Sequence, residues 1–311
     1  MTTWNASKLP DQTGRTFVVT GANSGLGLAA VDALAHAGAH VVLAVRSVDR
    51  GRAAVNTITN PGSERGGDLE VRRLDLADLA SIREFASNWQ GDLDVLINNA
   101  GLMHVAEGRT KDGFETQFGT NHLGHFALTN LLLPHITDRV VSLSSALHRG
   151  SRGINFENPN LTGEYSPTVA YSQSKLANLL FILELQRRLT AAGSSVRALA
   201  AHPGYSSTGL QGHDANAARR LALWVGNRVI ATDSRTGTLP TLYAATQDLP
   251  GASFVGPGGL GEMRGGPALV GRSSEASDPE AAKKLWTLSE ELTGVTFPTL
   301  NRPNQAVPAQ H

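Results

Sequence analysis

The sequence predicts an α/β fold in which one doubly wound parallel sheet of about seven strands carries helices on both faces. Short apolar runs rich in β-branched residues recur along the chain, and segments with helical spacing separate them. Residues 41–45 are apolar at every position, which is typical of a strand buried on both faces of a parallel sheet. The alternation of strand and helix patterns therefore predicts helices packed on both sides of the sheet.

The size and composition of the chain are consistent with this fold. With 311 residues and 41% hydrophobic residues, the chain is long enough to bury a sizeable core as a single domain. We expect that domain to span residues 1–300 and to be followed by a flexible, proline-bearing tail at 301–311.

The first strand and the first helix enclose a glycine-rich turn. Residues 16–19 predict a buried strand, and residues 28–35 carry apolar side chains at helical spacing. Between them, Thr20 to Gly27 (TGANSGLG) place glycines where a backbone can approach a pyrophosphate at a helix N-terminus. The turn predicts a dinucleotide site of the Rossmann type. The alternative is a turn that only joins two elements, because the spacing differs from the general Gly-x-Gly-x-x-Gly fingerprint.

Six further strands are predicted along the chain, and polar residues follow several of them. The strand candidates are residues 40–45, 69–74, 93–98, 139–144, 196–201 and 252–255.

The residues after the second predicted strand indicate which cofactor is preferred. Arg46 stands where a carboxylate would bind the ribose 2′-hydroxyl of NAD. A guanidinium suits a 2′-phosphate instead, and Arg50 offers a second donor. The sequence therefore favours NADP(H). NAD(H) stays the alternative, because Asp49 lies close enough to face the ribose.

Tyr171 and Lys175 form the clearest candidate for proton transfer. Residues four apart lie on one face of a helix, so the phenol and the ammonium can point the same way. A nearby cation favours the phenolate and lowers the pKa of a tyrosine toward neutrality. Tyr171 is the only tyrosine of the chain with a lysine four residues on, although a chance pair is the alternative.

Three other polar motifs lie at the ends of predicted elements. Ser144 and Ser145 close a central strand, where a hydroxyl can hold a carbonyl oxygen. Asn98 to Gly101 (NNAG) end the fourth strand, and Asn121 lies between apolar helix positions. Each has a structural alternative: a serine that only closes a strand, an ordinary turn, and a hydrogen-bonded core amide.

Taken together, these motifs resemble the short-chain dehydrogenase/reductase family over about residues 14–260. The matching stretches, in the family's order, are Thr20–Gly27, Asn98–Gly101, Asn121, Ser145, Tyr171–Lys175 and His202–Gly204. Within the family the chain is similar to the retinol-dehydrogenase-like and WW-domain-oxidoreductase-like branch. Residues 44–51 (AVRSVDRG), 171–181 (YSQSKLANLLF) and 285–294 carry this narrower resemblance.

The resemblance implies a role for each matching position. Tyr171 would be the acid/base, Lys175 would bind the nicotinamide ribose, Ser145 would polarise the carbonyl, and Asn121 would hold a relay water. The gap from Ser145 to Tyr171 is about twice the family's usual spacing, and its residues 146–170 predict an excursion near the mouth of the site. The implied cofactor contacts are Gly21, Asn23, Ser24, Gly25, Leu26, Gly27, Arg46, Asp75, Leu76, Asn99, Ala100, Gly101, Tyr171, Lys175, Pro203, Gly204 and Thr208. For Asp75, a helix N-cap is the alternative.

The segment at about 205–230 is predicted to cover the substrate. It follows the Pro203–Gly204 turn and carries six large apolar side chains between Leu221 and Ile230. An apolar face suits a lipophilic retinoid-, steroid- or fatty-aldehyde-like substrate, and the alternative is a helix packed on the core. Residues 176–189 are nearly continuously apolar, and the resemblance places a dimer interface on this helix, so we expect a homo-oligomer.

Composition and charge exclude several classes. The formal net charge is zero, so no basic excess indicates a nucleic acid. The chain has no cysteine, which excludes disulfides, zinc–thiolate sites and cysteine nucleophiles, and we predict no metal site. The N-terminal residues contain no signal-peptide pattern and no stretch is long enough to span a membrane, so we expect a cytoplasmic protein.

The sequence thus predicts an NADP(H)-dependent oxidoreductase acting on a small-molecule carbonyl or alcohol. The alternative is a non-catalytic NADP(H)-binding sensor or interaction protein on the same fold. The presence of Asn121, Ser145, Tyr171 and Lys175 together disfavours that alternative, because a sensor has no need of them. An epimerase or dehydratase is disfavoured by the glycine spacing and by the lack of a substantial substrate domain after Gly256.

Overall fold

The computed structural model describes residues 4–58, 67–204 and 234–300. These residues form one sheet with the strand order β3-β2-β1-β4-β5-β6-β7-β8, in which β8 alone runs antiparallel to its neighbour. The predicted fold class is confirmed. The bounds of the strands are β1 Thr16–Thr20, β2 His40–Val45, β3 Asp68–Arg73, β4 Leu93–Asn98, β5 Ile136–Leu143, β6 Arg197–Ala201, β7 Phe254–Pro257 and β8 Pro267–Leu269.

The eighth strand is the one that the sequence did not predict. β8 has three residues, none of them buried, so it lacks both the apolar run and the alternation that identify a strand. It forms by pairing with β7, which is a tertiary contact.

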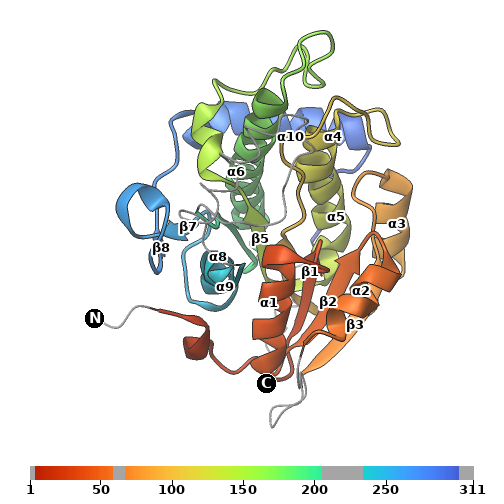
Figure 1. Ribbon diagram of the computed structural model, residues 1–311. Helices are drawn as coiled ribbons and strands as arrows, with labels where there is room; N and C mark the ends of the chain where they lie inside the picture. Colours follow the sequence, from red (N-terminus) through yellow and green to blue (C-terminus); the bar gives the residue numbers. More distant parts are fainter. Residues whose placement is uncertain (1–3, 59–66, 205–233, 301–311) are drawn as a thin grey trace, which may run out of the picture.

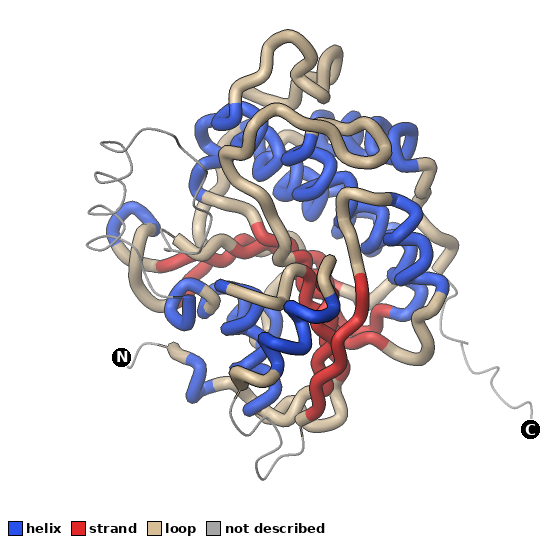
Figure 2. The backbone as a smooth tube through the Cα atoms, turned by 45° about the vertical axis from the view of Figure 1, so that its right-hand side comes forward, coloured by secondary structure: helices blue, strands red, loops and turns tan. Residues whose placement is uncertain are grey.

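Helices cover both faces of the sheet (Figures 1 and 2). None of the described helices is long and apolar enough to cross a membrane. The α-helices are α1 Gly25–His36, α2 Val48–Val55, α3 Leu79–Ser87, α4 Thr116–Phe118, α5 Gly124–Leu132, α6 Pro167–Ala191, α8 Ser234–Gly237, α9 Leu239–Thr246 and α10 Pro279–Thr293. The shorter turns are η1 Ala6–Lys8, the π-helix η2 Gly119–Leu123, η3 Leu133–His135, η4 Ala146–Gly150, η5 Leu260–Glu262 and η6 Glu275–Ser277.

The strand side chains divide the core into two layers. Along β1, Phe17 and Val19 belong to the layer that holds α1 and α9, whereas Val18 points into the layer that holds α3, α5, α6 and α10. This alternation follows from the two-residue period of a strand. Because both layers are apolar, the central strands are buried on both faces, as their sequences predicted.

Helix α10 covers the apolar side of α6. Trp286 stacks on Phe181 with ring centroids 5.8 Å apart and meets Phe126 edge-on at 4.9 Å. The guanidinium of Arg188 lies 4.5 Å from the centre of the Trp286 ring. The apolar run of α6 is therefore buried within its own chain. The homo-oligomer stays a prediction, but this helix no longer supports it.

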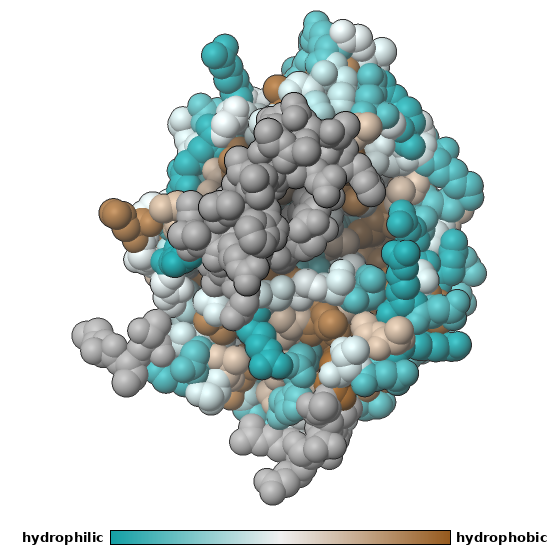
Figure 3. Space-filling model, viewed as in Figure 1, coloured by the Kyte–Doolittle hydropathy of each residue, from teal (hydrophilic) through white to brown (hydrophobic). Residues whose placement is uncertain are grey.

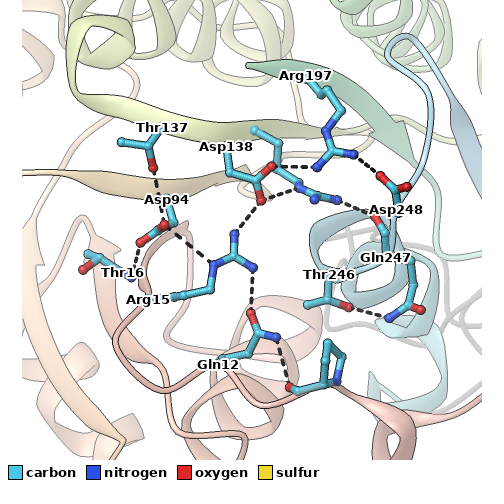
Figure 4. A network of polar contacts seen from close by, with 12 residues as sticks. Gln12, Arg15, Thr16, Asp94, Thr137, Asp138, Arg197, Thr246, Gln247 and Asp248 are labelled. Atoms are coloured by element: carbon cyan, nitrogen blue, oxygen red, sulfur yellow. Dashed lines mark hydrogen bonds and ion pairs between the residues drawn. The ribbon is translucent and has the colours of Figure 1, made fainter. Parts of the chain in front are cut away.

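A charged network joins the amino-terminal ends of four neighbouring strands (Figure 4). Asp138 of β5 accepts hydrogen bonds from Arg15 (2.5 Å), Arg139 (2.9 Å) and Arg197 (2.8 Å). Arg139 is itself buried and donates to the carbonyls of Ala244 and Gln247 in and after α9. The network stabilises the side of the sheet where these strands begin, whereas the candidate site lies on the side where the strands end.

Candidate active site

The candidate site lies where the order of strands reverses. β1 and β4 are neighbours in the sheet, whereas β2 and β3 lie on the other side of β1. In an open α/β sheet, ligands bind beyond the carboxyl ends of the strands at such a point. Here the glycine turn after β1 meets the turn after β4, because the Asn99 side chain donates to the carbonyl of Thr20 at 2.7 Å.

The glycine turn leaves room that side chains would fill. Gly21 and Gly25 have φ values of 65° and 56°, which favour glycine. A Cβ added at Gly27 would lie 2.5 Å from the Asn99 amide nitrogen, and one added at Gly21 would lie 2.9 Å from the Ala100 Cβ. Helix α1 begins at Gly25, three residues earlier than predicted, and its N-cap Ser24 makes no capping hydrogen bond. Its first N–H groups are therefore available to an anion, which fits a pyrophosphate.

The hydroxyl of Thr20 connects this turn to the catalytic region. Its oxygen accepts hydrogen bonds from the backbone N–H groups of Asn99 and Ala100, each at 2.9 Å. His125 Nε2 lies 2.9 Å from the same oxygen, and His125 Nδ1 lies 3.0 Å from the carbonyl of Asn121. A carbonyl only accepts, so Nδ1 carries the hydrogen. Burial lowers the pKa of His125 to about 4, so Nε2 is bare and accepts from Thr20.

Asn121 lies in a π-helical turn instead of the regular helix that the sequence predicted. The turn, η2, separates α4 from α5, and such turns are often found at functional sites. The amide nitrogen of Asn121 donates to the Leu102 carbonyl and to Ser174 Oγ, both at 2.9 Å, and Oδ1 accepts from the Leu102 N–H at 2.7 Å. Both amide hydrogens are thus engaged. A relay water would have to donate to one of the Asn121 oxygens.

Tyr171 and Lys175 lie one turn apart on α6, and both are buried. Lys175 Nζ is 5.7 Å from the centre of the Tyr171 ring and donates to the Leu143 carbonyl at 3.1 Å. A Cβ added at Gly101 would lie 3.3 Å from Nζ and 3.4 Å from Asn121 Oδ1, so these groups converge.

The ionisation of both groups is governed by burial. Burial lowers the pKa of Lys175 to about 8. Burial raises the pKa of Tyr171 above its ordinary value, and a hydrogen bond with the Ser145 side chain offsets this only in part. The prediction that Lys175 lowers this pKa toward neutrality is therefore wrong in this structure. The Ser145 side chain is a neighbour of the Tyr171 phenol.

The two neighbouring serines have different environments. Ser144 is buried and donates to the carbonyl of Lys175 at 2.8 Å. Ser145 is half-buried, caps the η4 turn by accepting from the Leu147 N–H at 3.2 Å, and keeps its hydroxyl at the site. Of these two serines, Ser145 is the one whose hydroxyl is not held by a bond to the core.

The residues predicted to contact the far end of the cofactor are placed as follows. Arg46 is exposed at the end of β2 and has no hydrogen-bond or ion-pair partner in the described part of the chain. Asp75 accepts from the Ala77 N–H at 3.0 Å, and Asp78 is the residue that caps α3, so the N-cap alternative for Asp75 is wrong. Leu76 is buried after β3, and Gly204 has a φ of 70°. Thr208 and the 205–230 segment lie outside the described residues.

Sequence reasoning missed several residues that support the site. Thr20 and His125 are hydrogen-bonded to each other, and Ser174 accepts a hydrogen bond from Asn121. His104 lies with its ring edge-on to Tyr171, with the ring centroids 5.8 Å apart. His104 has a φ of 53°, and its N–H donates to the buried side chain of Gln117 at 2.9 Å. The available signal was the position of Thr20 at a strand end and of His125 four residues after Asn121.

Comparisons with known proteins agree with this geometry. A family model described as short chain dehydrogenase matches residues 15–219. The chain belongs to the short-chain dehydrogenase family. It is therefore an NAD(P)-dependent oxidoreductase that acts on CH–OH and C=O groups.

The relatives place the chain in the retinol-dehydrogenase-like branch. Human (Homo sapiens) retinol dehydrogenase 13 is 37% identical over 302 residues, which cover 92% of this chain and 87% of the relative. Human polyprenol dehydrogenase is 35% identical over 94% of this chain and 88% of its own length. A crystal structure from Mycobacterium paratuberculosis, of a protein described as uncharacterized, is 53% identical, has a TM-score of 0.83, and is matched over 96% of this chain and 100% of that one.

Proposed function

We propose that this protein is an NADP(H)-dependent oxidoreductase that interconverts a lipophilic carbonyl compound and its alcohol. The observation that carries the proposal is the convergence of Ser145, Tyr171 and Lys175 beside the glycine turn, at the carboxyl edge of the sheet. A nicotinamide cofactor supplies the hydride chemistry when it is bound.

The chain's own residues supply orientation and proton transfer. Tyr171 gives its phenolic proton to the carbonyl oxygen of the substrate during reduction and takes a proton from the alcohol during oxidation. Ser145 donates a hydrogen bond to the same oxygen and stabilises charge that develops on it. The position of the Lys175 ammonium against Gly101 supports a role for this residue in binding the cofactor ribose.

The proposal favours NADP(H) over NAD(H) because of Arg46. The guanidinium is exposed at the end of β2 and is unpaired within the described residues, so it is free to bind a 2′-phosphate. A site for NAD would instead present a carboxylate there.

A lipophilic substrate is supported by exposed apolar side chains on elements that adjoin the candidate site in the chain or are linked to it by an ion pair. In the described ranges, five large hydrophobic side chains are exposed: Leu147, Val169, Leu260, Met263 and Leu269. They lie on η4, on the start of α6 and on the hairpin of β7 and β8. An ion pair between Arg149 and Glu262 joins η4 to this hairpin. Figure 3 shows hydrophobic side chains projecting where Figure 1 places this hairpin. Human retinol dehydrogenase 13 and polyprenol dehydrogenase are named for lipophilic alcohols, which agrees with the proposal.

The test measures oxidation of NADPH and NADH by absorbance, with retinoid, steroid and fatty aldehydes beside small hydrophilic carbonyls. We expect turnover with NADPH and the lipophilic substrates. Tyr171→Phe should lower kcat by about 10²-fold or more and leave NADPH binding unchanged. Tyr243→Phe, on α9 and away from the site, is the matched control. Turnover confined to hydrophilic carbonyls, or full activity of Tyr171→Phe, would overturn the proposal.

A further inference from the structure

The hairpin between β7 and β8 carries a half-buried carboxylate that joins two sides of the site. Glu262 forms a two-pronged ion pair with Arg149, with N–O distances of 2.9 and 3.1 Å. Its Oε2 also lies 3.1 Å from His202 Nε2. Arg149 belongs to η4, which directly follows Ser145, and His202 ends the segment before the Pro203–Gly204 turn.

The hydrogen bonds of His202 fix its tautomer. The backbone N–H of Gly204 donates to His202 Nδ1 at 3.2 Å, so Nδ1 is bare and Nε2 carries the hydrogen. Burial lowers the pKa of His202 to about 4, which keeps the ring neutral, although Glu262 acts in the opposite direction. Nε2 therefore donates a hydrogen bond to Glu262. The carboxylate fixes the orientation of the imidazole ring, whose Nδ1 in turn accepts the hydrogen bond from the Gly204 N–H.

On the other side, η4 connects Glu262 to Ser145. His148 Nδ1 lies 2.7 Å from the carbonyl of Ser145, to which it donates, and its Nε2 accepts from the Ser273 N–H at 3.3 Å. Arg149 also donates to the Gly271 carbonyl at 2.7 Å. The turn after Ser145 is thus attached to the hairpin through Arg149, and to the segment that follows β8 through His148.

The backbone of Glu262 has an energetically disfavoured conformation. Its φ is 56°, in the left-handed region that non-glycine residues rarely occupy. The Gly204 turn packs tightly here, because a Cβ added at Gly204 would lie 2.7 Å from the Met263 carbonyl and 3.2 Å from that of Glu262. A residue held in a disfavoured conformation beside a functional site is a reason to assign it a role there.

We infer that Glu262 is a positioning residue that holds the Pro203–Gly204 turn in register with the Ser145 turn. The inference rests on the proposed function and on the cofactor contacts of Pro203 and Gly204 that the resemblance to the family implies. With the Glu262 side chain removed, His202 loses its acceptor and Arg149 keeps only the Gly271 carbonyl, so the carboxylate no longer links the two turns. The effect should fall on cofactor binding.

The experiment compares Glu262→Gln and Glu262→Gly with wild type. Glutamine keeps the shape without the charge, whereas glycine relieves the positive φ and removes the side chain. We expect both variants to weaken NADPH binding about tenfold in a fluorescence titration, and to raise the KM for NADPH similarly, with kcat at saturating NADPH changed less than about threefold. Glu280→Gln, which breaks an exposed ion pair with Lys283 on α10, is the control and should bind NADPH like wild type.

Arg149→Met extends the test to the other side of the link. If Arg149 acts through Glu262, the double variant with Glu262→Gln should bind NADPH no more weakly than the weaker single variant. Wild-type affinity of Glu262→Gly, or fully additive losses in the double variant, would overturn the inference. Failure of the wild-type protein to bind NADPH would instead refute the proposed function.

Discussion

Thr20 donates its hydroxyl hydrogen to Nε2 of His125, across 2.9 Å, from the end of β1 to the first turn of α5. The same oxygen accepts two backbone N–H groups from the turn after β4, so the hydroxyl is saturated. His125 in turn donates to the Asn121 carbonyl in the π-helical turn. One neutral imidazole thereby joins the glycine turn after β1 to the π-helical turn that carries Asn121.

His125→Leu should destabilise the fold and weaken NADPH binding. The change leaves the Thr20 hydroxyl with only a long hydrogen bond to the Ile97 carbonyl (3.4 Å) and the Asn121 carbonyl without this donor, which costs roughly 1–3 kcal/mol. Urea unfolding and NADPH titration measure the two effects. The control is His135→Leu, which removes a ring that makes one exposed hydrogen bond to Gly91 and should change neither stability nor NADPH binding. Equal losses in the two variants would contradict the role assigned to His125.

The two serines after β5 should separate stability from catalysis. Ser145→Ala should lower kcat by about 10²-fold, because a donor to the substrate oxygen is lost, with little change in the melting temperature. Ser144→Ala should leave the chemistry largely intact and destabilise the fold by about 1 kcal/mol, because the buried bond to the Lys175 carbonyl is lost. Kinetics and thermal unfolding of both variants provide the comparison, and the reverse pattern would show that Ser144 is the serine that acts.

Lys175→Met should abolish most activity and yet stabilise the cofactor-free protein at neutral pH. The pKa of Lys175 is lowered by burial to about 8, so the unfolded chain holds this proton more tightly between about pH 8 and 10.5. The buried cation therefore costs roughly 3 kcal/mol below pH 8, and the cost disappears as the pH rises through that window.

Removal of the lysine leaves no unpaired carbonyl, because Asn178 also donates to Leu143, at 2.9 Å. Denaturant unfolding of the wild type and of Lys175→Met at pH 7 and pH 10 measures the difference in their stability. A variant that is less stable than wild type at pH 7 would show that the cation contributes to the fold.

Arg46→Ala should raise the KM for NADPH by about tenfold or more and leave that for NADH unchanged, because a charge-assisted contact to the 2′-phosphate is lost. Steady-state kinetics with both cofactors measure the change. Arg52→Ala, also exposed but on α2, is the matched control. Equal losses with both cofactors would mean that Arg46 does not read the phosphate.

Asp138→Asn should destabilise the protein most at neutral pH. Burial alone would raise the pKa of Asp138, but hydrogen bonds from Arg139 and Arg197 hold it below its ordinary value of 3.8. The stabilisation is therefore present above about pH 4 and is lost as the pH falls through the lowered pKa. We expect a loss of roughly 1–3 kcal/mol at pH 7 that shrinks toward pH 3, measured by urea unfolding. A loss that is constant with pH would exclude the charge as its cause.

The sequence was informative where local patterns decide the structure. The apolar runs predicted seven strands and the burial of the central ones, and the glycine spacing matched a turn where Gly21 and Gly27 have no room for a Cβ. Tyr171 and Lys175 share a face of α6 because helical spacing alone brings them together. These features depend on residues close in sequence, so a pattern can reveal them.

Features that depend on distant contacts were not predictable. The π-helical turn around Asn121 is held by Leu102 and Ser174, and it follows a buried Glu115 that caps α4. The apolar run of α6 suggested an interface between subunits, and only the structure shows Trp286 of α10 seated there. A helical pattern says how much surface must be covered, but it does not say which part of the chain covers it.

The charged network around Asp138 and the candidate site occupy opposite edges of the sheet. Mutations in η4 or in the hairpin of β7 and β8 that change the substrate specificity would therefore leave the arginine–aspartate contacts intact. For laboratory evolution this suggests a library confined to the carboxyl edge. Destabilised members of that library could be rescued by reinforcing the amino edge, with no cost to the new activity.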